Sequence, residues 1–502
     1  MEENGLLLGY DIGSSSIKAT LIEAASGAVV AAAGSPDTEM EISAPHEGWA
    51  EQHPDLWWNH LVDATSKLQQ AVGKRFQEIK AIGISYQMHG LVVVDDKFRV
   101  LRPAIIWCDS RAVEIGASAF RRLGEENFLK CFLNSPGNFT ASKLKWVMDN
   151  EPDIYGKINR AMLPGDYIAA RLTGKILTTA SGISEAILWN FTKGSRDQAL
   201  LDYYGIDPEL FPQSVDTFGF QGEVTAEAAA ELGLPGGTQV SYRAGDQPNN
   251  AFSLKVLDPG EVAATAGTSG VVYGVVDQAN YDPHSRVNTF VHVNHHSKRA
   301  RYGILLCVNG SGILNSWIKQ NLFAGRYSID YNRMNELAAQ VPVGSDGLVI
   351  LPFGNGAERT LENRDSGASI HGLRFNRHDR RHLLRAGQEG IVFALAYGLE
   401  IMKKLGLKIH TIRAGQANMF LSPLFSTAFA TITGARLELF STDGSQGAAR
   451  AAGVGAGIYS SLSEAFTGLS TIQIIEPDEA AAVQYRAAYR RWVEILEGVL
   501  AG

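Results

Sequence analysis

Cysteine is scarce in this sequence. Cys108, Cys131 and Cys307 are scattered over 502 residues, and none forms a CxxC pair. This odd number and spacing exclude a disulfide framework and a paired-cysteine zinc site, and they favour a reducing cytoplasm. Long apolar runs are also missing, since charged residues interrupt each run before 18 residues and no basic segment precedes an apolar core near the N-terminus. We therefore expect a cytoplasmic protein with no membrane-spanning or exported segment.

A surplus of positive charge is absent as well. Lysine and arginine total 45 against 53 aspartates and glutamates, which gives a net charge of −8, and no basic run occurs. Nucleic acid is therefore not an expected partner. The chain is 45% hydrophobic over 502 residues, which is more than one core normally organises. These values predict a globular protein of two domains.

Small residues are plentiful in a turn near the N-terminus. The stretch GYDIGSSSIKATLI, residues 9–22, indicates a strand, a turn and a second strand. Gly13 permits unusual backbone torsions, and Ser14 and Ser15 add hydroxyl and N–H groups that could hold a phosphate. An ordinary β-hairpin explains the stretch equally well.

The same pattern returns in the second half of the chain. In GEVAATAGTSGVVYGV, residues 260–275, the turn glycine Gly267 lies 267 − 13 = 254 residues after Gly13, and Thr268 and Ser269 follow it. This repeat predicts a duplicated chain with one phosphate-binding hairpin in each half.

Apolar runs alternate with helical patterns between the two repeats, which is typical of an α/β protein. The stretch GLPGGTQVSYRAGDQPNNA contains a turn, a strand and a new start at Gly245 and Asp246. We place a domain boundary near residue 242, with domains at 1–242 and 243–502. No low-complexity linker separates them, which favours two domains packed around a central cleft.

An acid stands directly before the first turn. Asp11 could hold Mg²⁺ through water beside nucleotide phosphates, and Lys18 on the second strand could contact a phosphate. The structural alternative is that the Asp11 side chain caps its own turn. Because the chain contains two hairpins of a size that suits a phosphate, we favour the role of metal ligand for Asp11 over turn capping.

A series of ordered motifs resembles the FGGY family of carbohydrate kinases, within the actin, hexokinase and Hsp70 superfamily. They are DIGSSSIK, GWAEQHPDLWW, ISYQMHGLVVVDD, LRPAIIWCDSR, FTASKLKWV, LPGDYIAARLTG, AGDQPNNA, AGTSG, LPFGNGAERT and QGAARAAG. The resemblance implies two actin/hexokinase-like (ribonuclease H-like) α/β domains. It also implies ATP-dependent phosphorylation of a primary hydroxyl of a pentulose, with D-xylulose the expected substrate, and MgATP as cofactor.

The resemblance also assigns the sugar site. Met88 and His89 follow the strand AIGIS and match the family's Met-His pair, whose alternative is a buried structural histidine. Trp107 and Asp109 match the family's Trp-x-Asp-x-Arg segment. For Asp109 a structural ion pair with Arg111 is an equal alternative.

Asp246 matches the family's catalytic base, which removes a proton from the attacking sugar hydroxyl. A helix-capping aspartate is the structural alternative. Gln247 stands where the family has asparagine, so its sugar contact is a weaker match.

The nucleotide residues come from both repeats. Gly13, Ser14, Ser15 and Lys18 of the first hairpin and Gly267, Thr268 and Ser269 of the second are expected to bind phosphates. By resemblance, Gly415, Gln416 and Asn418 approach the adenine, although Ala414 and Gln416 replace two of the family's glycines. Gly354, Glu358 and Arg359 match another family segment, interpreted as a closure loop or an ion pair.

Two further stretches resemble functional motifs, but we expect each to have a structural role. GVGAG, residues 453–457, lacks the next glycine of a dinucleotide fingerprint and is expected to be a small-residue helix. His292, His295 and His296 lack spaced acidic or cysteine partners, so a solvated loop is expected rather than a metal site.

Other functions stay open at this point. A non-catalytic ATP-binding protein of the actin or Hsp70 type would keep both hairpins but lack the sugar residues and the base. A kinase for another ketose or polyol, such as ribulose or fuculose, remains an alternative, whereas Met88 and His89 disfavour glycerol. The expected partners are a small sugar and ATP, and the sequence is compatible with a homodimer.

Overall fold

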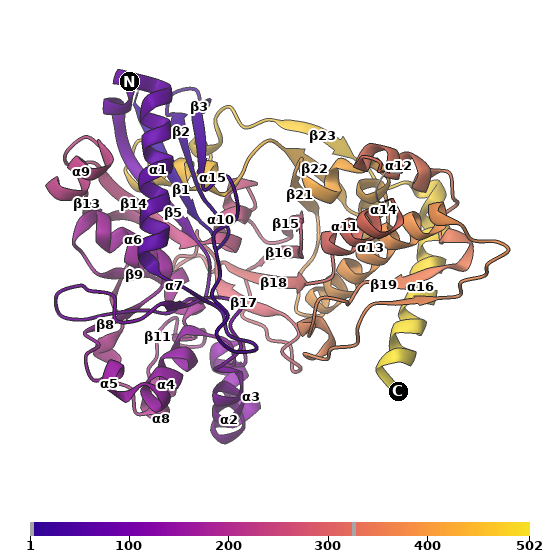
Figure 1. The fold of residues 1–502 in the computed structure, drawn as a ribbon, viewed down its shortest axis with the longest axis horizontal. Coiled ribbons are helices and arrows are strands. Elements are labelled where there is room, and N and C mark those ends of the chain that lie inside the picture. The colour runs from indigo at the N-terminus through magenta and orange to yellow at the C-terminus, as the bar shows by residue number, and fades with distance from the viewer. Residues whose placement is uncertain (1–4, 324–327, 502) are drawn as a thin grey trace. The chain divides into compact units, whose positions relative to one another are not determined.

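The computed structural model describes residues 5–323 and 328–501 (Figure 1). The chain divides into two compact units. The first contains the residues up to Lys255 together with 290–302 and 442–469, and the second contains 256–289, 303–441 and the residues from 470 onward. The sequence placed a boundary near residue 242, which lies within a strand of the first unit. In the described ranges, no helix is long and apolar enough to cross a membrane.

A six-stranded sheet forms the centre of the first unit. Its order is β13-β14-β5-β1-β2-β3. β1 is antiparallel to β2 and parallel to β5, and β14 is also parallel to β5, so the carboxyl ends of β1, β5 and β14 meet at one edge. The strands are β1 (Leu6–Ile12), β2 (Ile17–Glu23), β3 (Val29–Ser35), β5 (Ile79–Tyr86), β13 (Phe218–Glu223) and β14 (Gln239–Gly245).

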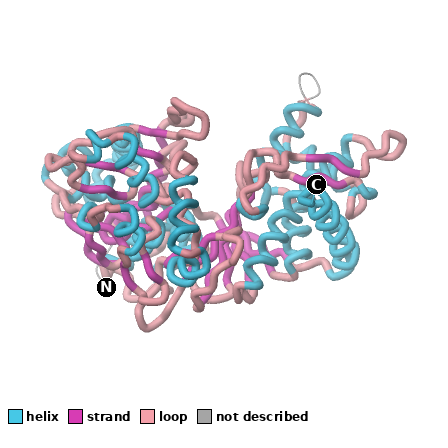
Figure 2. Tube along the Cα trace, turned by 90° about the horizontal axis from the view of Figure 1, so that it is seen from below, coloured by secondary structure: helices cyan, strands magenta, loops and turns pink. Residues whose placement is uncertain are grey.

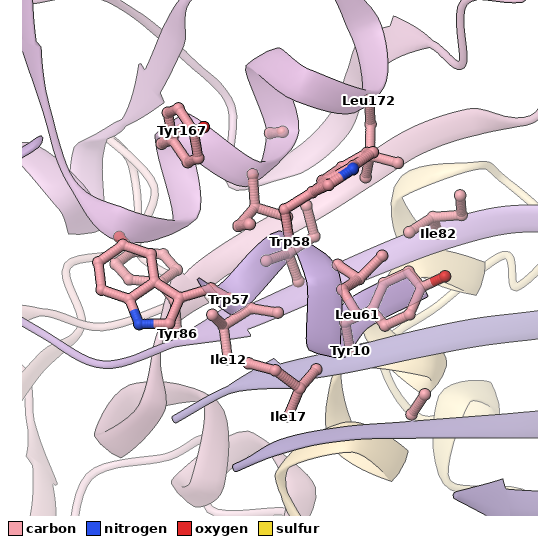
Figure 3. Close-up of a cluster of buried hydrophobic side chains, with 14 of the residues drawn as sticks. Tyr10, Ile12, Ile17, Trp57, Trp58, Leu61, Ile82, Tyr86, Tyr167 and Leu172 are labelled. Atoms are coloured by element: carbon pink, nitrogen blue, oxygen red, sulfur yellow. The ribbon is translucent and has the colours of Figure 1, made fainter. Parts of the chain in front are cut away.

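Helix α1 (Pro54–Val72) covers one face of this sheet (Figure 1). It begins with Pro54 in its first turn, where the missing N–H costs nothing, and ends at Gly73, which has a φ of 57°. Successive strand residues point to opposite faces, so alternate residues of β1 meet this helix. Figure 3 shows the resulting core, whose labelled side chains from α1 and the neighbouring strands are Trp57, Trp58, Leu61, Tyr10, Ile12, Ile17 and Ile82.

Helix α15 (Gly444–Gly455) packs against the opposite face of the sheet and consists mostly of glycine and alanine. A Cβ atom at Gly9 or Gly83 would overlap the backbone of α15 at Ser445 or Ala448. Glycine is therefore required on the strands to let helix and sheet approach closely. The expectation of a small-residue helix at 453–457 is confirmed for residues 453–455, which lie in α15.

Shorter elements complete the first unit. The helices are α2 (Val113–Leu123), α3 (Glu125–Phe132), α4 (Thr140–Asn150), α5 (Pro152–Tyr155), α6 (Pro164–Thr173), α7 (Ala180–Glu185), α8 (Ala199–Tyr204), α9 (Ala226–Leu232) and α10 (Asp246–Ser253). The short strands are β4 (Glu51–Gln52), β6 (Val92–Val94), β7 (Ala104–Ile105), β8 (Arg160–Met162), β9 (Leu177–Thr179), β10 (Trp189–Asn190), β11 (Ser195–Arg196) and β12 (Gln213–Val215).

The second unit is built on a seven-stranded sheet of order β17-β18-β16-β15-β21-β22-β23. Its strands are β15 (Glu261–Ala266), β16 (Gly270–Val276), β17 (Asn288–Val291), β18 (Tyr302–Val308), β21 (Thr411–Gly415), β22 (Arg436–Phe440) and β23 (Thr471–Ile475), and β19 (Val349–Leu351) pairs separately with β20 (Ser369–His371). Its helices are α11 (Gly312–Leu322), α12 (Tyr331–Ala339), α13 (Arg380–Lys404), α14 (Pro423–Thr433) and α16 (Glu479–Ala501).

The two sheets repeat one topology. In each, an antiparallel hairpin, β1-β2 or β15-β16, is followed across the sheet by a parallel strand, β5 or β21. A second parallel strand, β14 or β22, and an antiparallel one, β13 or β23, complete the series. Both units combine strands and helices (Figure 2). The predicted duplication is therefore confirmed in the fold.

Candidate active site

Acidic and polar side chains gather where the parallel strands of the first unit end. Asp11 stands one residue before the end of β1, Ser85 lies in its register on β5, and Asp246 begins α10 directly after β14. The carboxyl ends of parallel strands are the usual ligand site of an open α/β sheet. This edge is therefore the candidate active site of the first unit.

Asp11 is half-buried and held in place. The Ser85 hydroxyl donates a 2.7 Å hydrogen bond to Asp11 Oδ1, and Lys18 is its register partner on β2. Burial raises the pKa of Asp11 and the charge of Asp443 adds to this rise, while Ser85 and Lys18 lower it. Turn capping was the structural alternative for Asp11, and the hydrogen bond from Ser85 joins two strands rather than the turn.

Asp443 was missed by the sequence analysis. It precedes α15, and its Oδ1 accepts hydrogen bonds from the Gln446 N–H at 2.9 Å and the Ser445 hydroxyl at 2.8 Å. Gly444 lies so close to Asp11 that a Cβ there would be 2.5 Å from Asp11 Oδ2. A signal was present, since a strand followed by an aspartate and a helix is the same pattern that marked Asp246.

Asp246 sits in the first turn of α10 and is half-buried. Burial raises its pKa to about 7, the charge of Asp11 adds to the rise, and a 3.3 Å hydrogen bond from Gln247 Nε2 opposes it. A carboxyl group whose pKa lies near neutrality is suited to accept and release a proton. The Gln247 side chain therefore contacts the carboxylate of the predicted base.

Met88 and His89 follow β5 in the same unit. Met88 is 4% exposed, and a Cβ at Gly245, just before Asp246, would be 2.6 Å from Met88 Cγ. His89 has a φ of 60°, and its Nδ1–H donates to the Glu185 carbonyl at 3.1 Å. This bond places the proton on Nδ1, which makes Nε2 an acceptor in the neutral ring. The Met-His pair therefore lies beside the strand end that carries Asp246.

Glu185 is a second residue that the sequence analysis missed. It is fully buried at the end of α7, and its Oε1 accepts hydrogen bonds from the Tyr86 hydroxyl at 3.1 Å and the Gly245 N–H at 3.2 Å. Burial raises its pKa well above the ordinary value, and the charges of Asp246 and Asp166 add to this. Glu185 thus links the ends of β5 and β14.

Trp107 and Asp109 have different surroundings. Trp107 is 45% exposed and its Nε1–H donates to Ser14 Oγ at 3.2 Å, which joins the Trp-x-Asp-x-Arg segment to the first hairpin. Asp109 is fully buried, and its carboxylate accepts from the Ala50 N–H at 2.6 Å and from the Arg111 guanidinium at 2.7 Å. Arg111 is itself stacked 3.8 Å from the Trp49 ring centroid. These contacts favour the structural ion pair among the two roles left open for Asp109.

A Mg²⁺ ion fits the donor chemistry at this edge. In the described residues, no group of three or more His, Cys, Asp or Glu side chains is placed to hold a metal by itself. Mg²⁺ usually keeps several waters and takes only one or two protein carboxylates together with substrate phosphates. Asp11 could supply such a carboxylate.

The second unit carries a cavity of about 600 Å³ beside its hairpin. The turn residues Gly267 and Thr268 line it, together with the start of α11, residues of α12, and the 3₁₀ helix η6 (Asn418–Leu421). Asn418 has a φ of 54°, and its Nδ2 would be 3.4 Å from a Cβ at Gly267. The structure thus brings the hairpin and Asn418 together, and Asn332 and Asn335 of α12 join them without having been predicted.

Three other residues that were predicted to bind the nucleotide, Ser269, Gly415 and Gln416, do not line this cavity, although they are close in sequence to residues that do. Gly415 ends β21, and Gln416 is exposed with its N–H donating to the Phe440 carbonyl at 2.9 Å. Ser269 stands in the turn between β15 and β16. Within the first hairpin, Gly13 donates its N–H to the Ser16 carbonyl at 3.1 Å, and Ser15 is exposed.

Two interpretations of other segments can now be examined. The solvated loop expected for the histidines is wrong for His292, which is fully buried, while His296 is exposed. The error arises because Val291 and Val293 flank His292 with buried side chains and carry it into the protein.

Glu358, in the segment interpreted as a closure loop or an ion pair, is also fully buried. Its carboxylate accepts hydrogen bonds from the N–H groups of Asn309 at 3.0 Å and Gly310 at 3.1 Å.

Known proteins share both the sequence pattern and this fold. Residues 6–253 match the N-terminal domain of the FGGY family of carbohydrate kinases, and residues 262–456 match its C-terminal domain. The chain belongs to this family. The kinase is 28% identical to the xylulose kinase of Escherichia coli K12 over 507 residues, which is 99% of this chain and 100% of that protein. The predicted activity class, an ATP-dependent sugar kinase, is thereby confirmed.

Solved structures support the fold. The xylulose kinase of Rhodospirillum rubrum superposes with a TM-score of 0.88 at 27% identity, over 98% of the kinase and 99% of that chain. A gluconate kinase from Lactobacillus acidophilus superposes with a TM-score of 0.89 at 23% identity, over 100% and 99% of the two chains. The predicted actin/hexokinase-like α/β fold is confirmed, and the second comparison shows that the fold alone does not select the sugar.

Proposed function

We propose that the kinase transfers the terminal phosphate of ATP to the primary C5 hydroxyl of D-xylulose. The observation that carries the proposal is the placement of Asp246 beside Met88 and His89 at the strand edge that also holds Asp11. A base, a hydroxyl-binding imidazole and a carboxylate for a cation at one edge are the groups that this reaction needs. The names of the relatives support D-xylulose as the sugar.

Asp246 is the proposed general base. The attacking hydroxyl must lose its proton as the new O–P bond forms, and the carboxylate accepts it. With a pKa of about 7, Asp246 can accept the proton during transfer and return it to water after the product leaves. His89 and Met88 orient the sugar, with Nε2 of His89 accepting a hydroxyl hydrogen and Met88 packing on the carbon face.

The phosphate end of the substrate pair is assigned to the two hairpins. Asp11 would hold Mg²⁺ through water, and the ion neutralises charge on the transferring phosphate when bound. Gly13, Ser14, Ser15 and Lys18 are the proposed phosphate contacts of the first hairpin. Gly267, Thr268 and Ser269 are the proposed phosphate contacts of the second hairpin. The adenine is assigned to the cavity that Gly267 and Thr268 line together with Asn418, and Gly415 and Gln416 lie nearby in the chain.

The test is a coupled ADP-release assay on a panel of free ketoses, polyols and gluconate. We expect the highest kcat/KM with D-xylulose, and ³¹P NMR of the product should show a phosphate ester on C5. A higher kcat/KM for ribulose, fuculose or gluconate would overturn the choice of sugar. ADP release that needs no added sugar would overturn the sugar-kinase mechanism at this site.

A further inference from the structure

A buried lysine touches two segments of the candidate sugar site. Lys143 lies in the first turn of α4 and is fully buried. Its Nζ donates one hydrogen bond to the His89 carbonyl and another to the Ile106 carbonyl, each at 2.9 Å. A charge removed from water is costly unless it is well paired, so a lysine in this place must make contacts that an apolar residue could not replace.

The His89 main chain needs such support. Its φ of 60° lies in the left-handed region, which is uncommon and unfavourable for a residue other than glycine. The carbonyl that Lys143 binds belongs to this residue. The ammonium thus stabilises the left-handed main-chain conformation of His89.

The remaining contacts of the α4 start point to the same loop. The Thr140 hydroxyl donates to the Gly90 carbonyl at 3.3 Å, and the Phe139 ring packs edge-on against the His89 ring with centroids 4.8 Å apart. A Cβ at Gly90 would be 2.6 Å from Pro164, which fixes the other side of the loop. The start of α4 therefore holds this loop through three contacts, made by Phe139, Thr140 and Lys143.

The second carbonyl bound by Lys143 precedes Trp107. Ile106 is fully buried, whereas Trp107 is 45% exposed and reaches Ser14. The Lys143 ammonium therefore links the main chain at His89 to the main chain just before Trp107. Burial lowers the pKa of Lys143 to about 7, which Asp109 and Cys108 oppose and Arg111 reinforces.

We propose that Lys143 is a positioning residue for sugar recognition, whose ammonium ties the main chain at His89 to that at Ile106 and so fixes the side chains of His89 and Trp107. The proposal rests on the proposed function, because it concerns the same site. Lys143 does not touch the sugar. It acts through the two backbone segments that it joins.

Whether Lys143 holds the two backbone segments in place can be tested without measuring activity. Lys143→Leu removes both hydrogen bonds, and Lys145→Leu on the same helix removes a lysine whose partner is Asp149, away from the site. Hydrogen–deuterium exchange of the ligand-free proteins should show faster uptake in peptides covering 87–91 and 105–108 in Lys143→Leu only. Uptake unchanged in both peptides would overturn the proposal.

Kinetics then separate positioning from a general structural role. We expect Lys143→Leu to raise the KM for ketose about tenfold or more, the weight of a lost charge-assisted contact, with the KM for ATP within about twofold of wild type. A parallel change of both KM values would overturn the proposal and indicate only a structural residue. If Lys143→Leu does not fold, Lys143→Met, which keeps most of the side-chain length but has no hydrogen-bond donor, takes its place in both measurements.

The two proposals fail in different ways. If the wild-type enzyme phosphorylates no ketose, the proposed function fails, while the exchange experiment still decides whether Lys143 holds the two segments. If the wild type is active and the exchange pattern is unchanged by Lys143→Leu, the positioning role fails and the proposed function stands.

Discussion

The two hairpins of this kinase share one backbone but differ in charge. With the offset of 254 residues, Gly13 corresponds to Gly267 and Ser14 to Thr268, whereas Asp11 corresponds to Thr265. The first hairpin therefore lies at an edge with Asp11, Asp246 and Asp443, where the charge of Asp443 adds to the raised pKa of Asp11 and the charge of Asp11 adds to the raised pKa of Asp246. The second borders a cavity of about 600 Å³ lined by uncharged residues.

This difference indicates a division of labour within a duplicated fold. Carboxylates suit proton transfer and a cation, and that cation would offset their repulsion of the ATP phosphates. An uncharged cavity with amide and hydroxyl groups suits a base and ribose. The two copies keep the same turn and differ in their side chains at a few positions, which is the basis for proposing separate roles.

The largest expected effect comes from the acidic edge. Asp246→Asn keeps the size of the side chain but cannot accept a proton, so kcat should fall by roughly 10²- to 10⁴-fold. Calorimetric binding of ketose and ATP should largely survive, because the amide still reaches the hydroxyl. A folded variant that binds both ligands and keeps more than about a tenth of wild-type kcat would contradict the assignment, since tenfold is only about 1.4 kcal/mol of barrier.

The second effect concerns sugar recognition in the same unit. His89→Ala leaves a sugar hydroxyl without its partner, which should cost roughly 1 to 3 kcal/mol and appear as a lower kcat/KM for ketose. His296→Ala, which removes an exposed histidine, is the matched control. An equal loss of sugar-independent ATP hydrolysis in His89→Ala would mean that the change disturbed the fold instead.

The third prediction tests the contribution of the Asp11 charge while the backbone of the first hairpin stays the same. Asp11→Asn should lower activity at limiting Mg²⁺ by about 10- to 100-fold, with recovery as Mg²⁺ rises. Glu23→Gln at the far end of β2 is the control and should behave as wild type. Full activity of Asp11→Asn at limiting Mg²⁺ would show that another residue holds the ion.

The same variant gives a pH test with a defined sign. Burial raises the pKa of Asp246 to about 7 and the Asp11 charge adds to this, so at low substrate the rate should rise with pH through about 7. Removing the Asp11 charge lowers the Asp246 pKa, and the rising limb should move to lower pH. A limb that stays in place, or moves upward, would exclude Asp246 as the group that titrates.

The smallest effect belongs to the uncharged hairpin. Thr268→Val removes one hydroxyl from the cavity and should raise the KM for ATP by about two- to tenfold, the weight of one neutral hydrogen bond, with the KM for ketose unchanged. Thr268→Ser keeps the hydroxyl and should restore the wild-type value. Unchanged ATP KM and kcat in Thr268→Val would refute the role of the second hairpin.

Local patterns in the sequence were sufficient for much of this outcome. The two turns, the strand ends at Met88 and His89, and the strand-to-helix change at Asp246 all depend on residues a few positions apart. Alternation of side chains and the torsional freedom of glycine act over such short distances. The resemblance between motifs then supplied the chemistry that the patterns alone left open.

Other features were decided only when distant segments met. Asp109 lies in a segment that resembles a sugar-binding one, yet its carboxylate accepts from the Ala50 N–H, which is 59 residues away in the chain. Its other partner, Arg111, is a near neighbour in sequence that is held against the ring of the distant Trp49. His292 looks like part of a polar loop but is buried by its apolar neighbours.

The sequence by itself determined the two hairpins, the α/β alternation and the positions of Asp11, Met88, His89 and Asp246 at strand ends. Only the tertiary structure decided that Asp443 would approach Asp11 from more than 400 residues away, and that Lys143 would bind the carbonyls of His89 and Ile106. The physical reason is that strand and turn formation depends on torsions and alternation within a few residues. Burial, ion pairing and pKa depend instead on which segments share a region of low dielectric after folding.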